Sequence, residues 1–373
     1  MKTTRADKWI CVLFCTFLAC VFLLLLLLPE KDFSENEKRY LTQAPALSGE
    51  SVLSGRFADQ AERWAADHLP GRDFFVGLNA QYDLLAGRQV TKEIYRGRSG
   101  RLYEAPAALD ETQIERNLAA INALAATVGR EVDLMLVPGA GAVLQEDLPR
   151  FTDPYRDGEI LRAAYAEASD GVRPVDLWER FCGAADREAL YYRTDHHWTA
   201  RGAWLACGEY LRAKGREALP ESAYAVTAVP GFYGTTYTRS ALWSTPPESV
   251  ELWDSGGRFT VENADGGAPH AGLFYEERLA ESDKYPVYLD GNHSLLRIRS
   301  ASGGAGRILV VRDSFASCFA CFLADSYEEV VLVDLRYYRS PVSELLAQEE
   351  FDDVLVLYGV NNFMSDANLM RLE

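Results

Sequence analysis

An acid and two adjacent histidines lie within the segment YYRTDHHWTARGAW, residues 191–204. In an extended segment, side chains two positions apart point to the same side, so Asp195 and His197 are expected to act together while His196 turns away. A histidine that is oriented by a carboxylate is the usual base for activating a serine hydroxyl. The spacing therefore predicts acyl-transfer chemistry, provided that a serine lies within reach.

The candidate serine lies in RILVVRDSFASCF, residues 307–319, where an apolar run leads into a helical pattern. Ligand sites form at the carboxyl ends of strands in α/β sheets, and free N–H groups at a helix N-terminus favour a developing negative charge. We expect Ser314 to be the nucleophile, His197 its base and Asp195 the group that orients the base. The alternative is that Asp313 or Ser314 only caps the helix.

A third segment, DDVLVLYGVNNF (residues 352–363), places Gly359, Val360 and Asn361 after another apolar run. The Asn361 amide and the Ser314 backbone N–H are the predicted donors of an oxyanion hole, with a simple turn as the alternative.

The same acid and histidines offer a second interpretation, a metal site formed by Asp195, His196 and His197. Adjacent histidines on an extended chain diverge, and the metalloprotease spacing H-E-x-x-H is absent from the sequence. His293 is the one plausible supplementary ligand. We therefore expect neither a metal nor another cofactor.

Two further patterns involve cysteine. Cys318 and Cys321 form a C-x-x-C within an apolar helical pattern, which favours buried small side chains over a redox or zinc pair. A disulfide between Cys182 and Cys207 is left open.

The elements that must position these residues alternate between helical patterns and short apolar runs. The runs at 131–138, 307–311, 330–334 and 353–359 are nearly continuous in apolar residues. This alternation predicts an α/β fold with a parallel sheet covered by helices on both faces. Residues from about 215 to 305 break the rhythm, and we expect a β-rich insertion that forms a lid or a substrate platform.

The N-terminal part of the chain predicts a membrane anchor. Residues 9–28 carry no charge and are long enough to span a bilayer, and the basic residues before them predict a cytoplasmic N-terminus with an extracytoplasmic C-terminal domain. We expect a juxtamembrane stalk at 29–51, a helical and hairpin extension at 52–110, and the main domain at 111–373.

Charge narrows the class of partner. The chain has a formal charge of −17, and its first 29 residues contribute a net +2 from Lys2, Arg5, Lys8 and Asp7, so the remainder carries about −19. Such a surface repels polyanions, which argues against nucleic-acid binding.

These residues together resemble the SGNH hydrolase superfamily. Asp313-Ser314 is similar to its first block without the glycine, and Gly359-x-Asn361 is similar to its third block. The acid and base precede the serine, as in the alginate O-acetyltransferase (alginate acetylation) proteins. The chain most resembles the DHHW family of bacterial cell-surface proteins, through the segments FSENEKRYL (33–41), DHLPGRD (67–73), YRTDHHWT (192–199), LDGNHSLLRI (289–298), VVRDSFASCFACFLA (310–324), VDLRYY (333–338) and LYGVNNF (357–363).

The resemblance implies an SGNH hydrolase-like, flavodoxin-like fold. It also implies a membrane-anchored O-acetyltransferase or acetylesterase that acts on a surface or exported polysaccharide, with a membrane partner that delivers the acyl group. Two departures concern the oxyanion hole: Arg312 stands where the first-block glycine belongs, and the second-block glycine has no clear counterpart. The short PGAGAV loop (138–143) is expected to line the site as well.

Four residues are candidates for contacting the substrate: Trp198, Arg336, Tyr337 and Asn292. For Trp198, core packing is the favoured alternative. The main alternative function is a non-catalytic glycan-binding protein with a relic site, in which exposed aromatic residues of 232–253 form a stacking platform.

Overall fold

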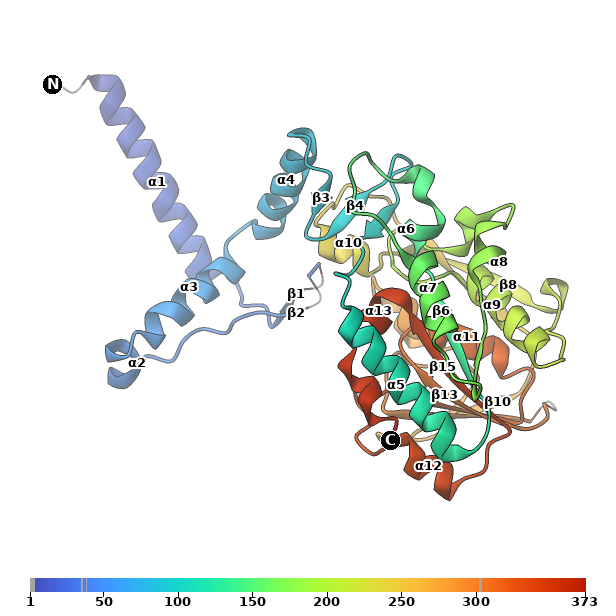
Figure 1. Cartoon of the computed structure of the whole chain (residues 1–373). Helices are drawn as coiled ribbons and strands as arrows, with labels where there is room; N and C mark the ends of the chain where they lie inside the picture. The colour runs from blue at the N-terminus through green and yellow to red at the C-terminus, as the bar shows by residue number, and fades with distance from the viewer. Residues whose placement is uncertain (1–3, 35, 38, 302–303) are drawn as a thin grey trace. The chain divides into compact units, whose positions relative to one another are not determined.

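The computed structural model describes residues 4–34, 36–37, 39–301 and 304–373 (Figure 1). The chain divides into two compact units, an N-terminal unit of residues 1–91 with 238–244, and a main unit of residues 92–237 with 245–373.

The N-terminal unit contains α1 (Arg5–Leu27), β1 (Phe33–Ser34), β2 (Arg39–Tyr40), α2 (Gly49–Leu53), α3 (Arg56–His68), α4 (Arg72–Leu85) and β3 (Val90–Thr91). The main unit contains β4 (Ile94–Arg96), β5 (Leu102–Glu104), α5 (Glu111–Val128), β6 (Val132–Val137), α6 (Ala140–Val143), α7 (Asp157–Ala166), β7 (Val172–Pro174), α8 (Trp178–Cys182), α9 (Ala200–Ala213), β8 (Ala225–Phe232), β9 (Glu248–Asp254), β10 (Phe259–Asn263), β11 (His270–Ala271), β12 (Leu295–Ser300), β13 (Arg307–Arg312), α11 (Ala316–Leu323), β14 (Glu329–Val333), α12 (Val342–Gln348), β15 (Asp353–Gly359) and α13 (Val360–Ser365). Helix α10 (Thr235–Ser240) has residues in both units.

An eight-stranded mixed sheet forms the centre of the main unit, in the order β11-β10-β12-β14-β13-β15-β6-β7. The five strands from β14 to β7 are parallel, and β12, β10 and β11 continue the sheet in antiparallel pairing. The parallel core and a β-rich insertion were predicted, and the structure joins the two in one mixed sheet. The antiparallel edge comes from the segment expected to be an insertion, because its alternating strands suit a sheet edge rather than a buried centre.

Helices cover both faces of the sheet, as predicted. Alternate residues of β13 point to opposite faces, so Ile308 and Val310 join one hydrophobic cluster with α9 and α11. Leu309 and Val311 join the other cluster with α5, α12 and α13. Burial on both faces explains why the strand reads as a continuous apolar run.

Strand β13 leads to β14 on one side of the sheet, and the chain then crosses to β15 on the other side. The carboxyl ends of β13 and β15 therefore lie at a topological switch point, where ligands bind in doubly wound folds. Ser314 follows β13 and Asn361 follows β15, so the topology brings their two segments to one edge.

The N-terminal unit contains one helix, α1, that is long and apolar enough to cross a membrane. None of its described side chains is buried, as expected for a segment that faces lipid. The predicted span 9–28 lies within this helix except for Leu28, and the helix begins earlier, at Arg5.

Two motifs of the N-terminal unit bind each other. Arg39, from FSENEKRYL, makes an ion pair with Asp67 of DHLPGRD at 2.5 Å between Nη2 and Oδ1, and Asp67 also accepts the Thr42 backbone N–H. Arg72 donates to Glu37 at 3.1 Å between Nη2 and Oε1. The predicted stalk at 29–51 is therefore partly folded, because its charged residues are held by partners in α3 and α4.

All seven cysteines are free thiols. Cys318 and Cys321 are buried in α11, as the apolar helical pattern predicted, and Cys182 and Cys207 do not form a disulfide.

Candidate active site

Three side chains of the main unit form a continuous hydrogen-bonded chain. The Nε2 atom of His197 lies 2.7 Å from the hydroxyl oxygen of Ser314. The other ring nitrogen, Nδ1, lies 2.5 Å from Oδ1 of Asp195. The Ser314 hydroxyl thus bonds to the imidazole and not to an N–H of α11, which disfavours the interpretation that Ser314 is only a helix cap.

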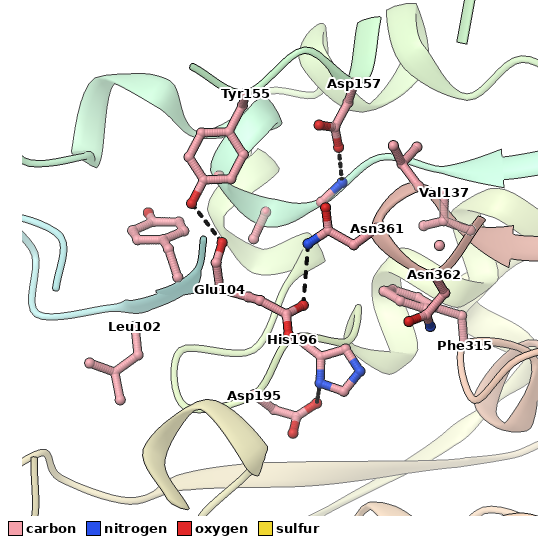
Figure 2. A pocket seen from close by; sticks show the side chains of 16 residues that line it. Leu102, Glu104, Val137, Tyr155, Asp157, Asp195, His196, Phe315, Asn361 and Asn362 are labelled. Atoms are coloured by element: carbon pink, nitrogen blue, oxygen red, sulfur yellow. Dashed lines mark hydrogen bonds and ion pairs between the residues drawn. The ribbon is translucent and has the colours of Figure 1, made fainter. Parts of the chain in front are cut away.

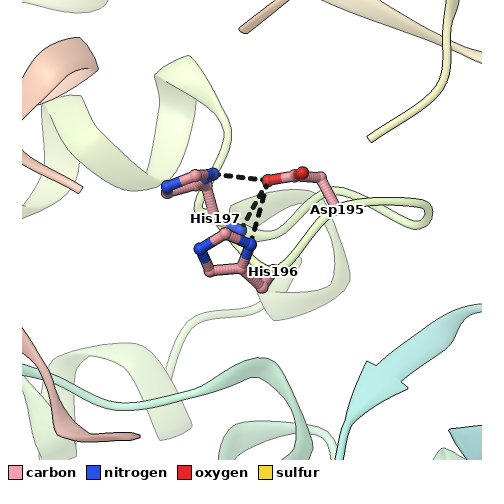
Figure 3. Close-up of side chains that lie close together, drawn as sticks. All are labelled: Asp195, His196 and His197. Carbon is pink, nitrogen blue, oxygen red and sulfur yellow. Dashed lines mark hydrogen bonds and ion pairs between the residues drawn. The ribbon is translucent and has the colours of Figure 1, made fainter. Parts of the chain in front are cut away.

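A β-bridge joins Tyr191 to Trp198, so the segment between them, which contains Asp195, His196 and His197, forms a tight bend. This turn lets Asp195 accept the backbone N–H of His197 as well as its ring, and both side chains are almost fully buried. The prediction that His196 turns away was wrong, because the segment is bent rather than extended. Its ring lies 3.8 Å from the His197 ring, centroid to centroid (Figure 3).

The electrostatics of the pair suit a base and its orienting acid. Burial alone would raise the pKa of Asp195, but the neighbouring His197 and His196 and its hydrogen bonds outweigh that and hold the pKa well below its usual range. For His197, burial and the neighbouring His196 lower the pKa, against the opposing effect of Asp195. The imidazole is therefore neutral near pH 7 and free to accept a proton.

Residues from the predicted insertion surround the hydrogen-bonded chain of Ser314, His197 and Asp195, which is called the relay below. Thr235 donates its backbone N–H and its hydroxyl to Oδ2 of Asp195, at 2.7 and 2.9 Å. Tyr285 stacks on the His197 ring at 3.9 Å, nearly parallel, and donates its hydroxyl to the Ser314 carbonyl. Gly234 is required here, because a Cβ at this position would overlap the Asp195 side chain. Sequence reasoning missed these contacts, and only the Gly-Thr pair in an otherwise bulky segment hinted at a close approach.

Asp313 connects the serine segment to the third motif. Its carboxylate accepts the Phe315 N–H, the Gly359 N–H and the Asn362 side-chain amide, at 3.0, 2.8 and 2.7 Å. A Cβ on Gly359 would lie 2.6 Å from the Phe315 ring, so this position needs glycine.

The asparagine that contacts the serine segment is thus Asn362, one residue beyond the predicted Asn361. Successive residues of α13 point about 100° apart, so the two amides face different neighbours. The Asn361 amide lies 3.4 Å from the Glu104 carboxylate and accepts the Ala107 N–H (Figure 2). In this structure Asn361 is held by the segment after β5 and not by the Ser314 region.

The substrate-contact candidates do not gather in one pocket. Trp198 is fully buried and donates its indole N–H to the Phe315 carbonyl, so core packing, the favoured interpretation, is confirmed and Trp198 does not contact substrate. Arg336 is held in a bidentate ion pair by Asp334. Tyr337 is half exposed, and the exposed Asn292 accepts a hydrogen bond from Arg312.

Arg312 occupies the place of the missing glycine without a left-handed backbone. It is the last residue of β13, and its buried guanidinium donates to the Gly291 carbonyl, to Asn292 and to Ser317.

The aromatic platform expected at 232–253 is not exposed. Phe232 and Trp253 are buried, and the other described aromatic side chains of this range are half-buried. Phe232 and Trp253 pack in the core, whereas Tyr233 packs against Tyr237 and Trp243 donates its indole N–H to the Asp73 carbonyl.

A small recess lies on the β6 and β15 side of the relay (Figure 2). Its polar lining includes Glu104, Tyr155, Asp157, His196 and Asn361. The PGAGAV loop contributes Gly139, Ala140 and Gly141, so its predicted position beside the site is confirmed.

The side chains of Asp195, His196 and His197 are close enough to hold a metal ion, with candidate ligand atoms within 4.8 Å of one another. These atoms already have other partners. Both Asp195 oxygens accept hydrogen bonds, and the outer nitrogen of His197 bonds to Ser314. The arrangement fits a proton relay better than a ligand set.

Comparison with known proteins shows what the main unit is similar to. The family model of the SGNH hydrolase-like domain of the acetyltransferase AlgX matches residues 96–280. Over 177 residues the chain is 25% identical to the probable alginate O-acetylase AlgJ of Pseudomonas putida. This match covers 45% of this chain and 46% of AlgJ. The match thus spans about half the length of that relative.

Solved structures share the fold. A DHHW family protein from Eubacterium siraeum superposes with a TM-score of 0.66 at 20% identity, over 76% of this chain and 95% of that one. Bacillus cereus PatB1 with a sulfonyl adduct superposes with a TM-score of 0.64 at 23% identity, over 75% and 98%. The resemblance to the alginate acetylation proteins is confirmed, and the DHHW family protein shares the fold.

Proposed function

We propose that the protein transfers an acyl group, in the simplest case acetyl, through Ser314, His197 and Asp195, because residues 96–280 match the family model of the SGNH hydrolase-like domain of the acetyltransferase AlgX. The observation that carries the proposal is the 2.7 Å contact between the Ser314 hydroxyl and a neutral, carboxylate-backed imidazole. A serine without such a base is a poor nucleophile at neutral pH.

In the first step the Ser314 oxygen attacks the carbonyl carbon of an acyl ester while its proton moves to Nε2 of His197. Collapse of the tetrahedral intermediate breaks the ester bond, and the imidazolium returns the proton to the leaving oxygen. In the second step an acceptor hydroxyl, or water, attacks the acyl-serine and the same proton path runs again. Asp195 keeps Nδ1 protonated and stabilises the imidazolium.

The developing oxyanion needs hydrogen-bond donors. The Ser314 backbone N–H has no protein partner within the described part of the chain, and it lies at the turn that enters α11. We assign it as the first donor. Asn361 stays a candidate for the second only if a bound ester draws its amide away from Glu104.

The acceptor is proposed to be a surface or exported polysaccharide, because the curated relative is named as an O-acetylase of one. The apolar α1 would anchor the chain in the membrane with the main unit outside the cytoplasm. An acyl-delivering membrane partner is part of the same proposal.

Ester turnover by the full-length chain in detergent tests this function. The native chain is expected to release p-nitrophenol from p-nitrophenyl acetate, and Ser314→Ala is expected to lose on the order of 10⁴ or more of that rate. Ser249→Ala, which removes an exposed hydroxyl from β9, is the matched control. Equal turnover by the native chain and Ser314→Ala would rule out Ser314 as the nucleophile.

A further inference from the structure

The recess beside the relay is placed to receive the group that accepts the acyl. It lies at the carboxyl ends of β6 and β15, and it is lined by His196 and Phe315, the chain neighbours of the base and the nucleophile (Figure 2). Ser314 and His197 are not among the described residues that line it, so the reacting hydroxyl of a ligand would have to lie at the mouth of the recess and not inside it.

The volume of the recess limits what can enter it. About 30 Å³ is room for little more than one water molecule. A sugar ring cannot be enclosed, so a ligand would lie across the mouth and insert a single substituent, such as a hydroxyl or an amine.

The lining selects the charge of that substituent. Glu104, Asp157 and Asp195 are acids, and none of the described lining residues is a lysine or an arginine. The Asn361 amide and the Tyr155 ring hydroxyl also line the recess, and both already donate to Glu104, at its carboxylate and at its carbonyl. A hydroxyl or an ammonium would find partners here, whereas a carboxylate would meet like charges with no cation to offset them.

Asp157 adds a nearly buried carboxyl group to this wall. One of its oxygens accepts the Gly139 N–H at 2.7 Å, and burial raises its pKa to about 6. The charge of the whole chain points the same way, because about −19 after the anchor repels polyanions at long range.

We propose that this recess is the acceptor subsite, and that it selects sugar units that are uncharged or carry an amine while it excludes uronates. This inference rests on the proposed function. In the transfer step, the acceptor hydroxyl oxygen bonds to the acyl carbon, its proton moves to Nε2 of His197, and the Ser314 oxygen leaves and regains that proton.

Binding to the full-length Ser314→Ala chain tests the inference without requiring turnover. The probes are three oligosaccharides of equal length: a neutral glucan, a glucosamine oligomer and a hexuronate oligomer. The first two are expected to bind at least about tenfold more tightly than the third in calorimetry or saturation-transfer NMR. Equal or tighter binding of the uronate, or no binding of any probe, overturns the proposal.

Charge reversal in the recess locates the selectivity. Glu104→Arg, made in the same Ser314→Ala chain, is expected to raise the ratio of uronate to glucan affinity by about tenfold or more. Glu115→Arg, an equal charge change on the exposed face of α5, is the matched control and should leave the ratio unchanged. The same change of ratio in both variants would assign the selectivity to net charge and refute the recess as the subsite.

The experiments distinguish a failure of the proposed acyl-transfer function from a failure of the acceptor-subsite proposal. If the native chain cleaves no ester, the proposed function is wrong, yet the binding preferences still report on the recess. If it cleaves esters but binds uronates best, only the acceptor assignment is wrong.

Discussion

Replacing Asp195 by asparagine is the most discriminating change in the relay. Four donors point at the carboxylate: the His197 backbone N–H and Nδ1–H at Oδ1, and the Thr235 backbone N–H and hydroxyl at Oδ2. An asparagine presents one acceptor oxygen and one NH₂ donor. Whichever way it is turned, its NH₂ group faces a backbone N–H that cannot rotate away.

Each orientation has its own consequence. If the NH₂ faces His197, the imidazole must carry its proton on Nε2 and cannot take one from Ser314. If it faces Thr235, the tautomer is kept, but a buried donor loses its acceptor, at about 1–3 kcal/mol, and the imidazolium loses its counter-charge. In a serine triad the wrong tautomer lowers kcat by about 10⁴.

We therefore expect Asp195→Asn to lower ester turnover by about 10³ to 10⁴, with a cooperative unfolding transition retained. The assay is kcat for p-nitrophenyl acetate beside a thermal melt, with Asp195→Ala for comparison. A rate within about tenfold of the native chain would refute the role given to this carboxylate.

Four further outcomes are expected. Because burial keeps the pKa of His197 below 6.5, kcat/KM should stay level on lowering the pH to 6.5 and fall only below it, and an acid limb centred above pH 7 would contradict this. Burial raises the pKa of Asp157 from 3.8 to about 6, so the ionised carboxylate destabilises the folded state. This destabilisation is absent below pH 3.8 and grows to about 3 kcal/mol as the pH rises past 6. Asp157→Asn should therefore remove the loss of stability between pH 5 and pH 8 that urea unfolding measures in the native chain. Gly234→Ala should cost roughly 10² in turnover, because its Cβ displaces Asp195; native-like kinetics would show that the backbone yields instead. Chelator treatment should leave turnover unchanged, and activity restored only by added metal would favour a metal centre at His197.

The central elements could be predicted because their patterns are local. The continuous apolar runs of β13 and β15 follow from burial on both faces, and each motif residue follows its strand directly. The meeting of Ser314 and His197 was a hypothesis that rested on the chemistry of the two residues and on the resemblance of their segments to motifs of one family.

The remainder depends on packing between distant segments. Nothing local to Thr235 or Tyr285 shows that they will surround His197, because their contacts exist only once the antiparallel edge has joined the sheet. The residue at which α13 begins decides whether Asn361 or Asn362 faces the serine segment, and composition does not fix such a boundary. The sequence favours core packing for Trp198, but it does not show that the indole N–H will bond to the Phe315 carbonyl.

The most direct test of the account is covalent capture at the nucleophile. The full-length chain is treated with methanesulfonyl fluoride, digested and mapped by mass spectrometry. The account predicts a single sulfonylated serine, Ser314, with fluoride as the leaving group and with labelling that becomes much slower in Asp195→Asn. An unlabelled Ser314 in a chain that still cleaves esters would contradict it.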